Sequence, residues 1–267
     1  MTLAETTLHA LHIEPVPAFQ DNYLWTLHDA TQAVVVDPGD AQPVLDYLTA
    51  RQLNLAAILV THHHPDHIGG VAKLVARFGC PVYGPAGEKI DVLTQRLRGG
   101  DSVEIAALGL AFKVLEVPGH TAGHIAYVGE INGGPAVLCG DTLFACGCGR
   151  LFEGTPAQMH TSLSALMALP DDTKVYCTHE YTMSNIRFAL AVEPGNAALQ
   201  ARAERDAATR AAGQPTLPSS IALEKATNPF VRWAAPEVIA AAQGKNPAAN
   251  DAVAVFAAIR EWKNNFK

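Results

Sequence analysis

The chain has 267 residues, of which 49% are hydrophobic and 17% are charged, and its formal net charge is -7. This length allows a full hydrophobic core and a second, smaller unit. The negative charge excludes the overall positive field with which proteins gather nucleic acid or anionic membranes, so a few local cations must hold any anionic substrate.

The start of the chain and its cysteines favour the cytoplasm. The first 25 residues lack a basic start followed by an unbroken apolar run, so we predict no secretory signal. No stretch is apolar for long enough to span a bilayer. The five cysteines are odd in number and lack the dense spacing of a disulfide scaffold, which favours a reducing compartment. We expect a cytoplasmic protein, with a monomer as the default state.

Short apolar runs alternate with helical patterns over the first two thirds of the chain. Runs rich in Val, Ile and Leu predict strands at 24–27, 33–36, 57–60, 112–117, 136–139 and 174–177. Helical spacing predicts helices at 41–52 and 71–78. Thr155 and Pro156 combine a capping hydroxyl with proline at a first helical position, which predicts a helix that Pro170 closes. This mixed order indicates an α/β fold.

The strand pattern disappears after Tyr181. Alanine-rich helical stretches follow at 182–192, 196–212, 235–243 and 251–267, and prolines separate them. The change predicts a domain boundary near residue 180. We expect a catalytic domain at residues 1–179 and a helical substrate-binding domain at residues 180–267.

The segment THHHPDH carries the strongest chemical signal. It follows a predicted buried strand and precedes a predicted helix, so it lies on a strand-to-helix loop. In an extended segment His62 and His64 point to the same side, and the turn at the proline brings Asp66 and His67 toward a second position. One loop therefore offers ligands for two neighbouring cations. The pattern should arise by chance on the order of once in a thousand such chains.

Three other predicted strands end in a possible ligand, namely His120, Asp141 and His179. Loops at one edge of a sheet can assemble a site from distant segments of the chain. Together with the first loop, they offer five imidazoles and two carboxylates. If one carboxylate bridges, this makes two sets of donors with room for a solvent molecule between two metal ions. A polar loop with incidental histidines is the alternative, and the additional ligands argue against it.

These motifs resemble a known family. THHHPDH, PGHTAGH, CGDTLF and CTHEYT follow one another as in the metallo-β-lactamase superfamily, and within it the chain is similar to glyoxalase II, the hydroxyacylglutathione hydrolase. The segments AFQDNYLW, VVVDPGD, GCGRLFEGT, TNPF and REWKNNFK extend the resemblance over nearly the whole chain. It implies the αβ/βα sandwich of the metallo-β-lactamase fold with a smaller C-terminal helical domain.

The resemblance also implies which residues bind metal. The first ion would be held by His62, His64 and His120, the second by Asp66, His67 and His179, with Asp141 as the bridge. Asp66 would also orient the attacking hydroxide. Two divalent ions are expected per chain; zinc is our first expectation, and iron and manganese also accept such nitrogen and oxygen donors. His63 falls at a variable position of the motif, and we interpret it as a surface residue or spacer.

The implied reaction is hydrolysis of S-D-lactoylglutathione and other S-2-hydroxyacylglutathiones to glutathione and a 2-hydroxy acid, by a hydroxide that bridges the metal ions, as in methylglyoxal detoxification. Glutathione carries two carboxylates, for which Arg and Lys are natural partners. Arg260 and Lys263 stand three residues apart, so they face the same way on a helix; an ordinary solvated helix face is their alternative role. The expected substrate contacts are Arg150, Phe152, His179, Tyr181, Arg260 and Lys263. Phe152 stands where many family members have tyrosine, which removes one hydroxyl contact.

Other roles stay open at this point. His124 is interpreted as a hydrogen-bonded buried histidine, and Asp37 either orients a ligand histidine or is a simple turn residue. Cys146 and Cys148 are interpreted as free thiols in a turn. The alternative functions are a glutathione persulfide dioxygenase with one iron, another hydrolase of this fold such as a nuclease, and a metal-binding module without catalysis.

Overall fold

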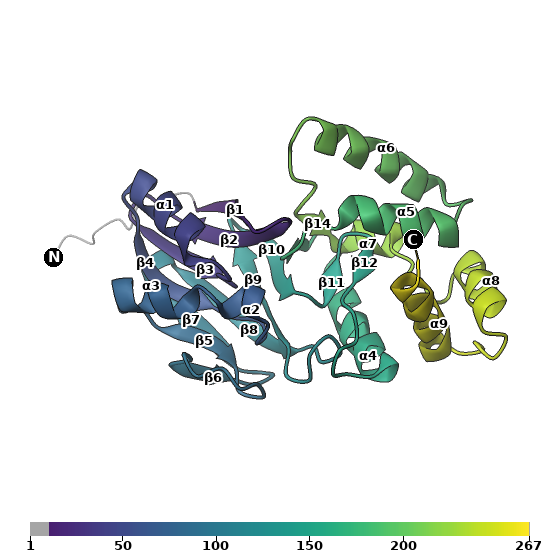
Figure 1. Ribbon diagram of the computed structural model, residues 1–267, viewed down its shortest axis with the longest axis horizontal. Helices are drawn as coiled ribbons and strands as arrows, with labels where there is room; N and C mark the ends of the chain where they lie inside the picture. The colour runs from purple at the N-terminus through teal and green to yellow at the C-terminus, as the bar shows by residue number, and fades with distance from the viewer. Residues whose placement is uncertain (1–10, 267) are drawn as a thin grey trace.

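The computed structural model describes residues 11–266, which form two facing β-sheets with helices outside them (Figure 1). The first sheet has the order β1 (His12–Ala18), β2 (Asn22–His28), β3 (Gln32–Val36), β4 (Asn54–Leu59), β5 (Val82–Pro85) and β6 (Gln95–Leu97). The second sheet has the order β14 (Ser219–Ser220), β13 (Lys174–Cys177), β10 (Gly134–Gly140), β9 (Ile125–Ile131), β8 (Leu110–Glu116) and β7 (Ser102–Ile105). A hairpin of β11 (Leu143–Phe144) and β12 (Gly147–Cys148) follows β10.

The helices cover the outer faces of the sheets and one end of the sandwich. They are α1 (Ala41–Arg51), α2 (Pro65–Ile68), α3 (Val71–Phe78), α4 (Pro156–Met167), α5 (Thr182–Val192), α6 (Ala197–Ala211), α7 (Ile221–Thr227), α8 (Pro236–Lys245) and α9 (Ala252–Asn264). The start of the chain, on which we predicted no secretory signal, includes residues 1–10, and the predicted last helix includes Lys267; these residues lie outside the described part. Among the described residues, no helix combines the length and apolar character needed to cross a membrane.

Alternation along β3 explains the two hydrophobic layers. Val34 and Val36 belong to the core between the sheets, whereas Ala33 and Val35 belong to the core beneath α1 and α3. Both faces of the strand are thus buried, which is why its sequence is apolar throughout. Complete burial of each valine contributes about 1.5–3 kcal/mol. This layered arrangement confirms the predicted αβ/βα sandwich.

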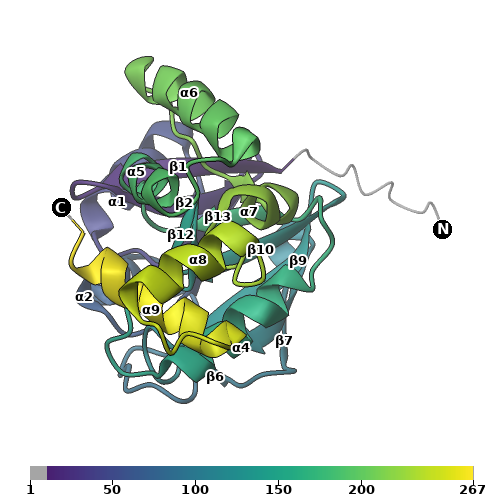
Figure 2. The same cartoon turned by 90° about the vertical axis from the view of Figure 1, so that its right-hand side faces the viewer.

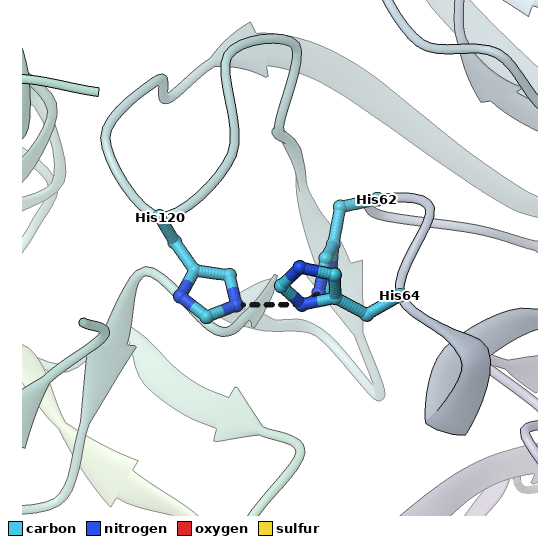
Figure 3. A group of neighbouring side chains, drawn as sticks. All are labelled: His62, His64 and His120. Atoms are coloured by element: carbon cyan, nitrogen blue, oxygen red, sulfur yellow. Dashed lines mark hydrogen bonds between the residues drawn. The ribbon is translucent and has the colours of Figure 1, made fainter. Parts of the chain in front are cut away.

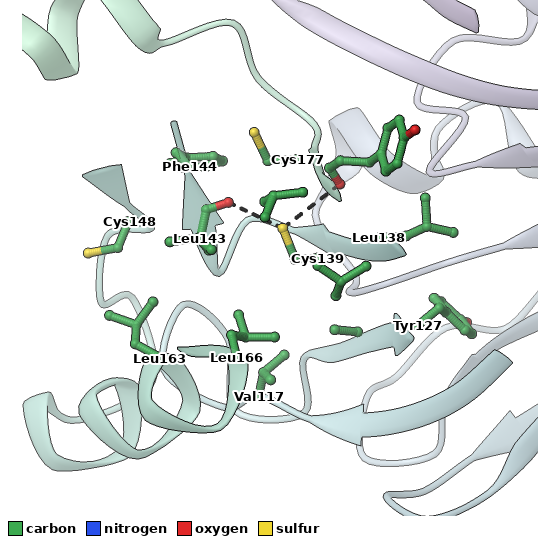
Figure 4. Close-up of a cluster of buried hydrophobic side chains, with 14 of the residues drawn as sticks. Val117, Tyr127, Leu138, Cys139, Leu143, Phe144, Cys148, Leu163, Leu166 and Cys177 are labelled. Atoms are coloured by element: carbon green, nitrogen blue, oxygen red, sulfur yellow. Dashed lines mark hydrogen bonds between the residues drawn. The ribbon is translucent and has the colours of Figure 1, made fainter. Parts of the chain in front are cut away.

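The core continues from the second sheet into α4. Figure 4 shows Leu163 and Leu166 of α4 near Val117, Cys139 and the β11–β12 hairpin. The Cys139 thiol donates to the carbonyl of Leu143 at 3.3 Å. Packing against α4 therefore supports the hairpin. Residues of the hairpin line part of the pocket described in the next section.

All six predicted strands are confirmed, as β2, β3, β4, β8, β10 and β13, and the predicted helices correspond to α1, α3, α4, α5, α6, α8 and α9. The prediction that no strand follows Tyr181 was wrong, because Ser219 and Ser220 of β14 pair with Val175 and Lys174 of β13. A strand of two residues is too short to show a pattern of alternating side chains. The sequence patterns did not predict β1, β5, β6, β7, β9, the β11–β12 hairpin, α2 or α7.

The C-terminal helices gather at one end of the sandwich (Figures 1 and 2). There α9 packs against α4 and α8, and α5 packs against α6. One hydrophobic cluster contains Leu163 of α4 as well as Phe256 of α9, so α9 shares the core of the preceding segment. This packing places the last helix beside the loops that follow β10 and β13. The division at residue 180 stays a prediction.

Candidate metal centre

The ligand loop begins where β4 ends. His64 has an extended backbone and caps α2, and Pro65 occupies the first turn of that short helix. Proline suits this position because its fixed φ matches the helix and its missing N–H has no helical partner there. The turn carries Asp66 and His67 away from the direction of the strand, as the sequence predicted.

His62, His64 and His120 form the first cluster (Figure 3). The Nδ1 atom of His64 lies 3.1 Å from His62 Nε2 and 3.0 Å from His120 Nε2. Burial lowers the pKa of all three imidazoles. They are therefore neutral, which is the form that binds a metal ion.

Asp66, His67 and His179 form the second cluster, and Asp141 lies between the two clusters. The Asp141 carboxylate oxygens lie 3.5 Å from His67 Nε2, 3.4 Å from His120 Nε2 and 3.3 Å from His179 Nε2. This is the position that a bridging ligand requires.

Buried atoms without partners indicate that the clusters are built for cations. Among the described residues, Nε2 of His67 and Oδ1 of Asp141 have no hydrogen-bond partner, although both atoms are buried. Leaving such a group unpaired costs about 1–3 kcal/mol. A cation would satisfy these atoms, and the donor set of imidazoles and carboxylates suits zinc, iron or manganese.

The electrostatics of the second cluster also favour positive charge. Burial alone would raise the pKa of Asp141, but His67 and His179 outweigh it and hold this pKa well below its usual range. Burial opposes a charge on His67 and His179, but nearby carboxylates, above all Asp141, raise the pKa of both imidazoles. The cluster thus stabilises positive charge in its interior.

Residues next to the ligands hold them in place. Asp37 Oδ2 lies 3.1 Å from His67 Nδ1, and its carboxylate also accepts from the Thr61 amide and hydroxyl at 2.7 Å. The structure therefore favours an orienting role for Asp37 over a simple turn. His124 is fully buried; it accepts from the Asp141 amide at 3.1 Å and stacks on His62, as expected of a hydrogen-bonded buried histidine.

The interpretation of His63 as a surface residue or spacer was incomplete. Its Nδ1 atom lies 2.9 Å from Glu88 Oε2, and its Nε2 atom lies 3.3 Å from Glu153 Oε1. The side chain is 33% exposed. It connects the ligand loop to two other loops, a contact that no spacing in the sequence reveals.

A pocket of about 640 Å³ joins the metal ligands to the last helix. The six predicted substrate contacts all line it: Arg150, Phe152, His179, Tyr181, Arg260 and Lys263. Five further lining residues were not singled out from the sequence, namely Phe144, Ser184, Asn185, Asn264 and Phe266, and Cys148 was predicted only as a free thiol. Most of these residues belong to types that carry no specific chemical signal. Their closeness in sequence to predicted site residues was the one signal that could have indicated them.

Arg260 is held in place without a carboxylate. Its Nη1 atom donates to the Cys148 carbonyl at 3.0 Å, and its Nε atom donates to Asn264 Oδ1 at 3.2 Å. The guanidinium carbon lies 4.8 Å from the centre of the Phe230 ring. Arg260 is only 5% exposed, so it does not lie on an ordinary solvated helix face.

Lys263 lies one helical turn further along α9. Its ammonium donates to the Ser184 carbonyl at 3.1 Å. Burial, together with repulsion from Arg260 and other cations, lowers the pKa of Lys263 to about 8. Within residues 11–266, neither Lys263 nor Arg260 forms an ion pair with a carboxylate, so both charges are available to an anion.

Two aromatic rings flank the ligands on the pocket side. Tyr181 stacks on His179 with a centroid distance of 4.6 Å and an interplanar angle of 3°. Phe152 is 62% exposed and lies edge-on to His64 and His120. The nearby Cys148 is a free, buried thiol, as predicted.

Comparison with known proteins agrees with this geometry. Residues 18–179 match the family described as the Metallo-beta-lactamase superfamily, and residues 180–266 match the family described as Hydroxyacylglutathione hydrolase C-terminus. A protein of Cupriavidus taiwanensis named Hydroxyacylglutathione hydrolase is 57% identical over 265 residues, covering 96% of this chain and 100% of the relative. A protein of the same name from Pseudomonas aeruginosa is 54% identical over 260 residues, with the same coverage.

Solved structures share the fold. The structure of ETHE1 from Myxococcus xanthus matches with a TM-score of 0.63 and 25% identity, covering 96% of this chain and 99% of that chain. The structure of TTHA1623 in a di-iron-bound form matches with a TM-score of 0.56 and 26% identity, covering 81% of this chain and 99% of that chain. By its two family matches and its full-length relatives, the chain belongs to the hydroxyacylglutathione hydrolase (glyoxalase II) family of the metallo-β-lactamase superfamily.

Proposed function

We propose that this protein hydrolyses S-D-lactoylglutathione and related S-2-hydroxyacylglutathiones to glutathione and a 2-hydroxy acid. The relatives named Hydroxyacylglutathione hydrolase, which match over their whole length, support this reaction. One observation carries the proposal: a cluster of metal-type ligands and a pair of cations without counter-ions, Arg260 and Lys263, open into the same pocket.

The seven candidate ligands would hold two divalent cations: His62, His64, Asp66, His67, His120, Asp141 and His179. When bound, such cations polarise a thioester carbonyl and lower the pKa of water toward neutrality. We expect zinc first, with iron or manganese as alternatives, since these donors accept all three. The di-iron-bound form of TTHA1623 supports a pair of metal ions on this fold.

Asp66 has the surroundings of a group that orients a nucleophile. Its side chain is 41% exposed, and it lines the pocket. The side-chain Nδ2 of Asn22 donates to Asp66 Oδ2 at 3.1 Å, so one carboxylate oxygen is already held by the protein. The carboxylate can accept a hydrogen bond from the attacking water. This orients the water so that a lone pair of its oxygen points at the carbonyl carbon.

The other end of the pocket suits glutathione. Arg260 presents a fixed guanidinium fork, which matches the geometry of a carboxylate, and Lys263 adds a point charge beside it. We propose that this pair binds the glycine carboxylate of glutathione, and that Arg150, Tyr181 and Phe152 contact the rest of the tripeptide.

The leaving group needs little assistance from the protein. A thiol of this kind has a pKa near about 8.5, so its thiolate departs without a strong general acid. Divalent cations held by the seven candidate ligands would also stabilise the departing negative charge. We also propose that the active form is a monomer and that it works in the cytoplasm, where the free cysteines are expected to stay reduced.

The decisive experiment follows thiol release from S-D-lactoylglutathione by the purified protein, with the metal content measured on the same sample. A chelated sample and the S-D-lactoyl thioester of N-acetylcysteamine are the controls. We expect turnover that chelation abolishes and that is much weaker with the truncated thioester. A fully metallated protein that leaves the glutathione thioester intact but consumes oxygen with glutathione persulfide would instead be a persulfide dioxygenase.

A further inference from the structure

The β1–β2 turn, near the N-terminal end of the described chain, contacts the second metal cluster. The residues Phe19, Gln20 and Asp21 connect the two strands, and Phe19 adopts a left-handed backbone with a φ of 53°. The Glu180 amide donates to the Asp21 carbonyl at 2.9 Å, and the Tyr23 amide donates to the Thr178 carbonyl at 2.7 Å. Backbone hydrogen bonds thus fasten the turn to the segment that carries His179.

Two side chains of this hairpin contact ligands directly. Asp21 Oδ1 lies 2.7 Å from His179 Nδ1, and Nδ2 of the Asn22 side chain lies 3.1 Å from Asp66 Oδ2. Because the Asp21 carboxylate accepts, Nδ1 of His179 carries the proton, and Nε2 is left with its lone pair. That Nε2 atom lies 3.4 Å from Asp66 Oδ2 and 3.3 Å from Asp141 Oδ2. Asp21 thereby selects the tautomer that can bind a cation among these groups.

The first cluster is supported differently. Its His62 Nδ1 atom faces the Thr61 hydroxyl at 3.1 Å, and its His120 Nδ1 atom faces the Arg150 carbonyl at 2.9 Å. Both partners are neutral. In the second cluster, Asp21 lies against His179 in addition to the contact between Asp37 and His67. Carboxylate partners raise the basicity of an imidazole ligand, and neutral partners do so less.

We propose that Asp21 is a positioning residue of the second metal site, and that its carboxylate selectively strengthens the binding of the cation held by Asp66, His67 and His179. The inference rests on the proposed pair of metal ions. It does not depend on which substrate the enzyme cleaves.

The test is a zinc titration of the metal-free protein against a competing chromophoric chelator. Asp21→Asn, which keeps the shape of the side chain and removes its charge, is introduced into two backgrounds. His120→Ala disables the first site and isolates the second, whereas His179→Ala disables the second and isolates the first. We expect Asp21→Asn to weaken zinc binding about 10-fold to 100-fold in the His120→Ala background. In the His179→Ala background we expect a change below about twofold.

Glu180→Gln provides the matched control. Glu180 lies at the same junction, and its carboxylate accepts from the Tyr23 hydroxyl and from the amide and hydroxyl of Thr216. Among residues 11–266, its side chain forms no hydrogen bond or ion pair with a metal ligand. We expect this variant to lower the melting temperature of the metal-free protein and to leave both zinc affinities unchanged.

Three results would overturn the proposal: unchanged zinc affinity with Asp21→Asn in the His120→Ala background, equal weakening in both backgrounds, or equal weakening by Glu180→Gln. The backbone bonds of the turn do not use the Asp21 side chain, so the variant should fold, which circular dichroism checks. If Asp21→Asn does not fold, Asp21→Glu undergoes the same titrations, again with weakening expected only at the second site. Because no thioester is present, the result is independent of the proposed substrate.

Discussion

The two walls of the pocket differ in whether their buried polar groups have hydrogen-bond partners. On the wall formed by the strand ends, Nε2 of His67 and Oδ1 of Asp141 are buried without hydrogen-bond partners among the described residues. On the wall formed by α9, the buried Arg260 donates to the Cys148 carbonyl and to Asn264. The polar atoms of the first wall need a cation as their partner, whereas those of the second wall find their partners within the protein.

This difference determines what each wall can do. Buried ligand atoms without hydrogen-bond partners reduce the stability of the folded protein. They therefore mark a place where a bound metal ion contributes to stability as well as to chemistry. A guanidinium fixed by a carbonyl and an aromatic ring keeps its charge and loses little freedom when a carboxylate arrives. We therefore expect substitutions in the wall formed by the strand ends (the metal wall) to reduce kcat. Substitutions in the wall formed by α9 (the α9 wall) should raise KM.

The largest effect should come from the bridging position. Asp141 faces imidazoles of both clusters, so Asp141→Asn removes the charge that they share. We expect kcat for S-D-lactoylglutathione to fall about a thousandfold, as happens when a charge-stabilising group is removed from a reaction centre. Elemental analysis should find fewer than two metal ions per chain. A variant with both metal ions and more than a tenth of the original kcat would contradict the bridging role.

The next largest effect should come from Arg260→Ala. Hydrogen bonds to charged groups contribute about 1.5–3 kcal/mol, which corresponds to a rise in KM of about 10-fold to 100-fold for the glutathione thioester. The kcat should change little, because the α9 wall lies away from the metal ligands. Arg77→Ala, an exposed arginine on α3, is the control and should leave KM unchanged. An equal rise in KM for the N-acetylcysteamine thioester would refute a contact with glutathione.

The charge of Lys263 should produce a pH dependence. Burial and neighbouring cations lower its pKa to about 8, so the ammonium loses its proton as the pH rises through that value. Loss of the positive charge weakens carboxylate binding, and kcat/KM should therefore fall above pH 8, at most about tenfold per pH unit. Arginine stays protonated over this range. In Lys263→Arg the fall should accordingly move to higher pH; a profile that stays the same would assign the fall to another group.

The smallest effect should come from the rim of the pocket. Phe152 is 62% exposed, and Phe152→Tyr adds a hydroxyl at the rim of the pocket. A single neutral hydrogen bond contributes about 0.5–1 kcal/mol, so KM should fall about twofold to fivefold with kcat unchanged. Steady-state kinetics on the same thioester measure this change. If KM does not move, the added hydroxyl has no partner in the substrate.

Much of this molecule follows from local patterns. Apolar residues predicted six strands of the two sheets, because a strand buried on both faces, such as β3, is apolar throughout and a strand buried on one face, such as β8, alternates apolar and exposed residues. The spacing of His62, His64 and His67, with proline between them, indicated ligands for two cations on one loop. Strand ends then supplied His120, Asp141 and His179. These signals are short-range, so the sequence alone reveals them.

Only the tertiary structure decided which groups support these residues. Asp21 meets His179 across 158 residues, and Arg260 meets the Cys148 carbonyl across 112 residues. Neither contact leaves a mark on its own stretch of sequence, because an aspartate in a turn and an arginine on a helix are common in any protein. The sequence determined the ligands and the strands that carry them. Packing between distant segments decided the orientation of those ligands and the surroundings of the cations, since such contacts depend on the whole chain folding together.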